Sequence, residues 1–207
     1  IRILLFCGLL GGLVGLLGKT GATQAFGKWV ANRVHTGRAS LLMTWIFGLV
    51  IFIDDYFNSL AVGTVMRPIT DRCNVPRAKL AYVLDSTAAP ICILAPISSW
   101  VVTVMSIVKG SEGFADLGIS EFEFFIRSIP YNIYAILTLI MVLVVILTKR
   151  DYGPMTASNR HAAQTGKLFN DAYGDAPGEV GGLDSKEHAA SFDMLFPIVV
   201  LIASAVA

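Results

Sequence analysis

Long apolar runs alternate with short polar segments along the whole of this sequence. Five runs contain no basic residue, and they span positions 3–18, 39–66, 80–108, 128–148 and 194–207. A helix that crosses a bilayer needs about 20 predominantly apolar residues. Runs of about this length, repeated along one chain, predict an all-α polytopic membrane protein. We expect transmembrane helices at 1–18 and 128–148 and the start of another at 194–207.

The run 39–66 is divided near its middle by polar residues. Its first part, 41–53, is predominantly apolar and would form a half-helix about 20 Å long at 1.5 Å per residue. The polar residues that follow are Asp54, Asp55, Asn58 and Ser59. The flanking segments 19–38 and 67–79 are both net positive, and positive loops favour the cytoplasmic side. We therefore predict a re-entrant hairpin over 39–66, with both ends on the same side of the membrane.

The remaining segments complete the predicted organisation. Pro90 and Pro96 each remove a helical hydrogen bond, so we expect the run 80–108 to be a broken transmembrane helix. The basic, amphipathic segment 19–38 is typical of an interfacial helix. The polar segment 149–193 is predicted to be a cytoplasmic loop. Because the chain begins and ends within apolar runs, we interpret residues 1–207 as part of one transmembrane domain of a longer protein.

Composition and charge narrow the classes of function. Only 15% of the residues are charged and the net charge is +1, whereas soluble domains average about 25% charged residues. This balance argues against a nucleic-acid partner and for the lipid bilayer as the surroundings of the chain. Cysteine and histidine residues show no spacing typical of a metal site. We therefore predict no cofactor.

Three carboxyl groups are exceptions to the apolar pattern. Asp54, Asp55 and Asp85 are the charged residues within the five runs, and no lysine or arginine accompanies them there. A charge at the bilayer centre costs at least about 2.5–3.5 kcal/mol. Such a carboxyl group either takes a proton or binds a cation. A group that can do either, but not both together, is suited to cation/proton exchange.

Neutral oxygen atoms lie close to these acids in the sequence. The side chains that could supply them are Asn58, Ser59, Ser86 and Thr87. Hard cations such as Na⁺ prefer oxygen ligands, and two adjacent interrupted segments point to the central site of a transporter. We predict an ion-binding site made of these residues and the three acids. Asp55 and Asp85 are the predicted competing ligands for the metal ion and the proton.

Simpler interpretations of the same residues stay open. Asp54 and Asp55 could lie in water at the end of a span. Asp85 could pair with Arg77 or Lys79 at the interface. The hydroxyl groups could be ordinary hydrogen-bonding groups between helices. The whole chain could also be a structural membrane subunit or, less in keeping with its motifs, an intramembrane aspartyl protease.

Three segments of the chain resemble the NhaC-type sodium/proton antiporter family. They are 52–59, 66–71 and 79–90, which include Phe52-Ile53-Asp54-Asp55-Tyr56-Phe57-Asn58-Ser59 and Asp85-Ser86-Thr87. The resemblance is strongest over 19–108. It implies membership of the ion transporter superfamily, whose members use inverted repeats, re-entrant hairpins and unwound helices. The chain would then be one half of an inverted-repeat transporter that needs the rest of its own chain.

The resemblance also implies a function and partners. We expect a secondary active antiporter that exchanges Na⁺ for H⁺ across a prokaryotic plasma membrane by alternating access, with Na⁺ as the transported ion. Relatives that couple sodium and protons to malate or lactate make an organic acid exchanger the alternative. The residues carried over by the resemblance are Asp54, Asp55, Asn58, Ser59, Asp85, Ser86 and Thr87. Homo-oligomerisation stays open.

Overall fold

The computed structural model describes residues 34–169, together with the isolated positions 8, 12, 15, 16, 19–21 and 196. Apart from those positions, the predicted helices at 1–18 and 194–207 lie outside the described residues. So do most of the predicted interfacial helix 19–38 and residues 170–193 of the predicted loop.

The described part of the chain is helical and contains no strand. Its elements, in order, are α3 (Gly37–Val50), α4 (Asp55–Arg72), α5 (Arg77–Leu94), α6 (Ser99–Lys109), η1 (Ala115–Leu117), α7 (Glu121–Ser128), η2 (Ile129–Tyr131), α8 (Ile133–Thr148) and α9 (Pro154–Thr165). The helical fold expected from the sequence is therefore confirmed for these residues.

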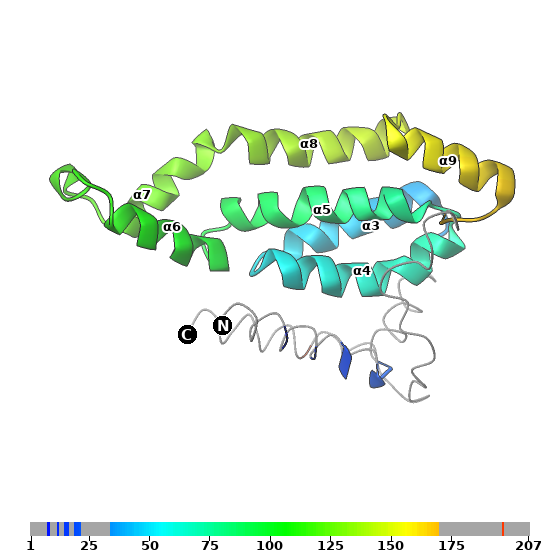
Figure 1. The fold of residues 1–207 in the computed structure, drawn as a ribbon, viewed down its shortest axis with the longest axis horizontal. Helices are drawn as coiled ribbons and strands as arrows, with labels where there is room; N and C mark the ends of the chain where they lie inside the picture. Colours follow the sequence, from blue (N-terminus) through cyan, green and yellow to red (C-terminus); the bar gives the residue numbers. More distant parts are fainter. Residues whose placement is uncertain are drawn as a thin grey trace.

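Helix α5 lies at the centre of the bundle. It contacts α3, α4 and α8, and these four helices run along the long axis of the molecule (Figure 1). Helices α6 and α7 extend the bundle at one end, and α9 lies at the other (Figure 1). The helices are interrupted between α3 and α4 and between α5 and α6.

The chain reverses direction between α3 and α4. Figure 1 shows that α4 runs back alongside α3, and residues 51–54 form the turn. Asp54 begins α4 because its side chain accepts a hydrogen bond from the backbone N–H of Phe57, as acids at helix N-caps commonly do. Helix α4 ends at Arg72, beyond the end of the predicted hairpin at 66. The relation of this helix pair to a membrane stays a prediction.

The interruption after α5 falls at the second proline of the run. Pro90 lies inside α5, whereas residues 95–98, which include Pro96, separate α5 from α6. Pro96 leaves the carbonyl of Cys92 without its helical N–H donor, and the hydroxyl of Ser98 donates to that carbonyl at 2.6 Å. The helix axis bends by 52° across the break. The helix therefore continues through Pro90 and is broken at Pro96.

Helix α8 begins later than the sequence pattern suggests. The predicted helix 128–148 includes Pro130, and residues before Ile133 belong to α7 and η2, which meet α8 at an angle of 47°. Helix α9 was not anticipated, because its polar composition has no apolar stripe. Its ends nevertheless carry local signals, namely Pro154 at the start and Gly166, with φ of 71°, at the end.

Among the described residues no helix by itself has both the length and the apolar character needed to cross a membrane. Two bent helix pairs are long and apolar enough when each pair is taken together: α5 with α6, and the α7–η2 segment with α8. The predicted broken helix 80–108 corresponds to the first pair. The predicted span at 128–148 corresponds to the second pair, with its bend near the start.

Two apolar clusters hold the helices together. The first joins α4 to α3 and α5 and contains Phe57, Val62, Met66 and Leu80 among its buried members. The second joins α3, α5 and α8 through residues that include Val83, Val142 and Ile146. Because both clusters include residues of α5, the position of α5 fixes the two breaks relative to each other.

A buried ion pair should contribute more to stability than an exposed one in this bundle. The ammonium group of Lys79 lies 2.5 Å from Asp151, and both side chains are buried. Lys79→Ala leaves a buried carboxylate without its partner, which typically costs about 3–5 kcal/mol. We expect a clear fall in the thermal unfolding midpoint of the full-length protein in detergent.

The control for this prediction is Arg127→Ala. Arg127 pairs with Glu123 at 2.5 Å on the exposed side of α7, and exposed helix pairs contribute about 0.3–0.5 kcal/mol. Equal effects of the two substitutions on the unfolding midpoint would contradict the difference in burial on which the prediction depends.

Candidate cation site

The two interruptions of the helices meet in space. The backbone N–H of Ser99, at the start of α6, donates to the carbonyl of Ile53 at 2.8 Å. The hydroxyl of the same serine donates to Asp54 at 3.0 Å. Ser99 and Asp54 are 45 residues apart in the sequence. The turn between α3 and α4 is therefore bonded directly to the break between α5 and α6, and we call this place the break junction.

Asp54 is the buried carboxylate of the break junction, with only 6% of its surface exposed. One of its oxygens accepts from the N–H of Phe57 at 3.0 Å, and the other accepts from Ser99. An ionised carboxylate has about four acceptor positions, so two remain for a cation or a proton. The alternative that Asp54 lies in water at a span end does not fit this burial.

Asn58 lies one helical turn after Asp54 and is completely buried. Its amide nitrogen donates to the carbonyls of Gly48 at 2.7 Å and Ile51 at 2.6 Å, at the end of α3. Its side-chain oxygen is buried and receives no hydrogen bond among the described groups. A buried oxygen without a donor is suited to a cation, because it has lost water and gained no replacement.

We expect Asn58→Leu to destabilise the hairpin. Leucine has a similar volume but no N–H group in its side chain. The carbonyls of Gly48 and Ile51 would therefore both lose a donor, at a cost of about 1–3 kcal/mol for each buried group. The thermal unfolding midpoint of the full-length protein measures this loss. Asn132→Leu is the control, because Asn132 makes one long bond of 3.4 Å to Ser128. If the two substitutions lowered the midpoint equally, Asn58 would not hold the hairpin.

Gly48 brings α3 close to α5 at the break junction. A Cβ atom added at Gly48 would lie 2.7 Å from the Cγ2 atom of Thr87 and 3.8 Å from the side-chain oxygen of Asn58. The hydroxyl of Thr87 donates to the carbonyl of Val83 in its own helix at 2.6 Å. Gly48 was not among the predicted site residues, although small residues are known to let apolar helices approach closely in a membrane.

The other predicted site residues are placed differently. Asp55 and Ser59 are half-buried in the first turns of α4, and Ser86 is half-buried on α5. Asp85 is exposed on α5, and its side chain forms no hydrogen bond or ion pair within the described part of the chain. It therefore pairs with neither of the two basic residues considered for it. Their acidic neighbours are Asp71, 3.3 Å from Arg77, and Asp151, close to Lys79.

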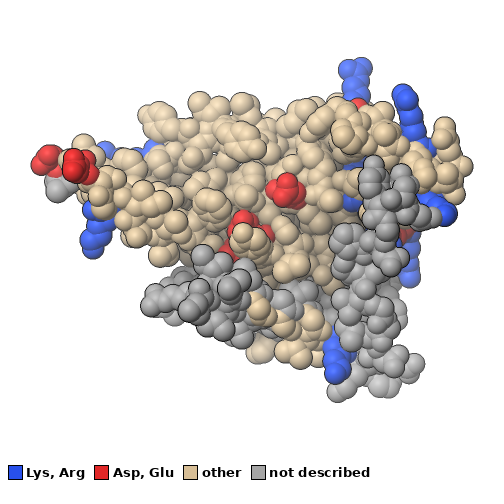
Figure 2. Space-filling view, in the orientation of Figure 1, with Lys and Arg blue, Asp and Glu red and all other residues tan. Residues whose placement is uncertain are grey.

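The described residues contain no group of three histidine, cysteine or acidic side chains arranged to hold a metal ion. A cation at the break junction would therefore depend on mixed oxygen ligands: one carboxylate, an amide oxygen and backbone carbonyls. The carboxyl ends of α3 and α5, which carry partial negative charge, lie here beside the amino ends of α4 and α6, which carry partial positive charge, so the negative charge for a cation comes from the carboxylate. Figure 2 shows acidic side chains in the middle of this face, where no basic side chain is seen, and basic side chains towards the ends, one of which also carries acidic side chains.

Interrupted apolar helices that meet at a buried carboxylate define a class of protein. Irregular backbone of this kind is tolerated within a membrane where it is buried in protein or lines a cavity, and it is the arrangement that ion-coupled transporters use for their central sites. Comparison with known proteins agrees with this class. A family model described as the Na⁺/H⁺ antiporter family matches residues 91–207. The chain belongs to the Na⁺/H⁺ antiporter family.

A relative was found that matches the whole of the chain. It is a protein of Haemophilus influenzae (strain ATCC 51907 / DSM 11121 / KW20 / Rd), described as an uncharacterized protein, with 38% identity over 209 residues. The alignment covers 100% of this chain and 38% of that protein, so the chain spans well under half of the relative's length. No solved structure matches the chain.

Membership of this family excludes one of the classes left open by the sequence. It is a family of membrane transport proteins and not of enzymes, so the aspartyl protease alternative is set aside. The family description names a cation and a proton. It gives no support to exchange of organic acids such as malate and lactate.

Proposed function

We propose that this chain forms part of an Na⁺/H⁺ antiporter of the NhaC type, located in the plasma membrane, and that the break junction takes part in binding the transported ion. The observation that carries the proposal is the position of Asp54. It is a buried carboxylate, bonded to both interrupted helices, with acceptor positions left over. The family match supports the exchange of a cation for a proton.

The proposed site uses groups from both sides of the break junction. Asp54 supplies the charge, and the unpartnered oxygen of Asn58 supplies a neutral ligand. Asp55, in the adjacent position, is the second carboxylate. Na⁺ and a proton cannot occupy the same carboxylate oxygens together, so binding of one displaces the other. Asp85, Ser59, Ser86 and Thr87 stay predicted site residues, and other parts of the transporter would complete the site for the whole protein.

Alternating access would require the two breaks to separate and rejoin. Two hydrogen bonds of Ser99 link the α5–α6 break to residues 53 and 54. A proton on Asp54 or an ion beside it changes the charge that Ser99 faces. We propose that this is how occupancy of the site is communicated to α6.

The experiment that tests the function uses the full-length protein in everted membrane vesicles. A pH gradient is established across the vesicles, and NaCl, LiCl, KCl or choline chloride is then added. We expect Na⁺ to dissipate the gradient and choline to leave it unchanged. A gradient that only malate or lactate dissipates would overturn the cation/proton assignment, and no response to any addition would favour a structural subunit.

A further inference from the structure

We propose that a polar cavity at the α8–α9 end of the bundle binds the phosphate of an anionic phospholipid headgroup. The cavity has a volume of about 580 Å³. The polar residues that line it are Asn74, Lys149, Asp151, Thr156, Asn159 and Arg160. They come from the turn between α4 and α5, from the link between α8 and α9, and from α9 itself.

The cavity carries an excess of positive charge. Its acid, Asp151, is already compensated by Lys79, which is buried 2.5 Å away, and also accepts from the amide of Asn159. Lys149 and Arg160 have no acidic partner within the described residues. Two uncompensated cations beside amide and hydroxyl donors are a suitable lining for a phosphate group.

The backbone around the cavity supports a ligand-binding role. Asn74 and Lys149 both line it, and they are the two residues other than glycine with positive φ among those described, at 54° and 57°. Lys149 ends α8 in the left-handed conformation, where glycine is usual. A lysine that is held in this conformation places its charge at the cavity at a conformational cost, and such residues cluster at functional sites.

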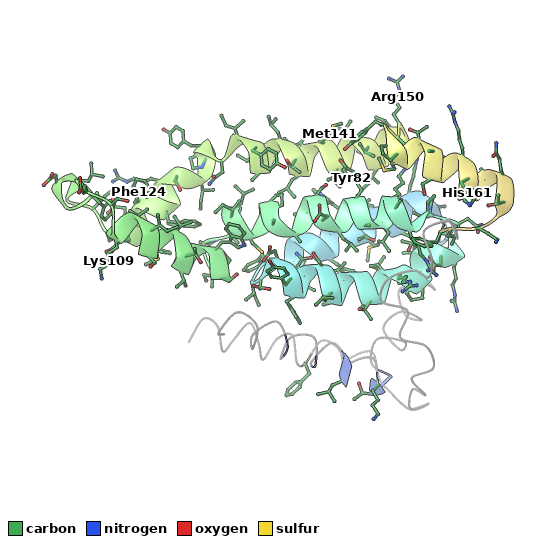
Figure 3. All side chains as sticks on the ribbon, viewed as in Figure 1. Tyr82, Lys109, Phe124, Met141, Arg150 and His161 are labelled. Carbon is green, nitrogen blue, oxygen red and sulfur yellow. The ribbon has the colours of Figure 1, made fainter. Side chains whose placement is uncertain are left out.

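The surface next to the cavity favours a lipid over free phosphate. One side of α8 exposes an apolar stripe formed by Leu137, Ile140, Met141, Val144 and Leu147. These residues recur at helical spacing, and the stripe ends two residues before Lys149. Figure 3 shows Met141 on this helix. An acyl chain along the stripe would bring its headgroup to the end of α8, at the level where anionic headgroups meet basic side chains.

The test uses the full-length protein in detergent, with phosphatidylglycerol or phosphatidylcholine added and bound lipid counted by native mass spectrometry. We expect a preference for phosphatidylglycerol. The combined variant Lys149→Gly and Arg160→Gln should weaken phosphatidylglycerol binding by roughly 30-fold, as expected for the loss of two charges near a membrane surface. Glycine suits the backbone at position 149, so the unfolding midpoint of this variant should not fall.

The control is Arg150→Gln, which removes one positive charge beside the cavity, as each half of the combined variant does. Arg150 does not line the cavity, and its side chain points away from the bundle (Figure 3). This variant should keep the lipid preference. Equal weakening by Arg150→Gln, unchanged binding by the combined variant, or displacement of the lipid by low millimolar inorganic phosphate would each overturn the proposal. The proposal depends on membrane placement and not on cation exchange, so its failure would leave the break junction unaffected.

Discussion

Replacing Asp54 with asparagine should abolish Na⁺-driven proton exchange without unfolding the protein. Asparagine is as good a helix N-cap as aspartate, so α4 keeps its bond from Phe57 to position 54. The amide oxygen can also accept from Ser99. What is lost is the negative charge and the ability to take a proton, and these are the two properties that exchange needs.

The size of the effect follows from the loss of a charged ligand. An interaction with a charged group contributes about 1.5–3 kcal/mol, which corresponds to a roughly 10- to 150-fold weaker affinity for Na⁺. Exchange itself should fall below detection, because no proton is released when the ion binds. Exchange is measured in everted vesicles at several Na⁺ concentrations, and the unfolding midpoint is measured in parallel.

Asp116→Asn provides the matched control for Asp54→Asn. Asp116 is an exposed acid in η1, outside the bundle, and its substitution removes the same charge. It should leave exchange unchanged. Normal exchange by Asp54→Asn, in a protein that is folded and present at normal amount, would exclude Asp54 from ion binding.

Gly48→Ala should block function by pushing α3 away from α5. Alanine favours helix formation by about 1 kcal/mol relative to glycine, so local helix propensity predicts a gain. The added Cβ, however, would lie 2.7 Å from the methyl carbon of Thr87. Overpacking of this kind costs about 1–3 kcal/mol. The resulting shift displaces the carbonyl of Gly48, to which Asn58 donates, so we expect exchange to fall sharply.

Two further variants separate this clash from a general effect of the substitution. Gly63→Ala places a Cβ 3.2 Å from the end of the Leu84 side chain, which can move aside, so exchange should be nearly normal. Thr87→Ser removes the clashing methyl group and keeps the hydroxyl. Combined with Gly48→Ala, it should restore much of the exchange. Full activity of Gly48→Ala alone, or no rescue by Thr87→Ser, would contradict the packing described at the break junction.

The interruptions of the helices could be predicted because local chemistry causes them. Pro96 removes a donor from the carbonyl of Cys92 whatever the rest of the chain does, and Asp54 is a good N-cap in any helix. Helix α9 could not be predicted from apolar periodicity, because it has too few apolar residues. The late start of α8 could not be predicted from Pro130 alone, because other prolines of this chain, Pro68 and Pro90, lie inside helices.

The sequence could not show how the predicted site residues are arranged in space. Asn58 and Thr87 both lie close to Gly48, and Asp54 begins the same helix as Asn58, but Asp85 lies on another side of α5 from Thr87. Two positions along a helix turn a side chain by about 200°, so Asp85 faces away from Val83, which is fully buried. An apolar run such as 80–108 has no polar face to reveal this orientation. The orientation of Asp85 is set by the packing of α5 against α3 and α4, which cannot be derived from the sequence alone.

The central claim is that Na⁺ and a proton compete for Asp54 at the break junction. The most direct test is equilibrium binding of radioactive Na⁺ to the purified full-length protein, measured over a range of pH for the unmodified protein and for Asp54→Asn. We predict that the affinity of the unmodified protein falls as the pH is lowered, and that Asp54→Asn binds Na⁺ weakly at every pH. Na⁺ binding by Asp54→Asn with the same affinity and the same pH dependence as the unmodified protein would contradict the claim.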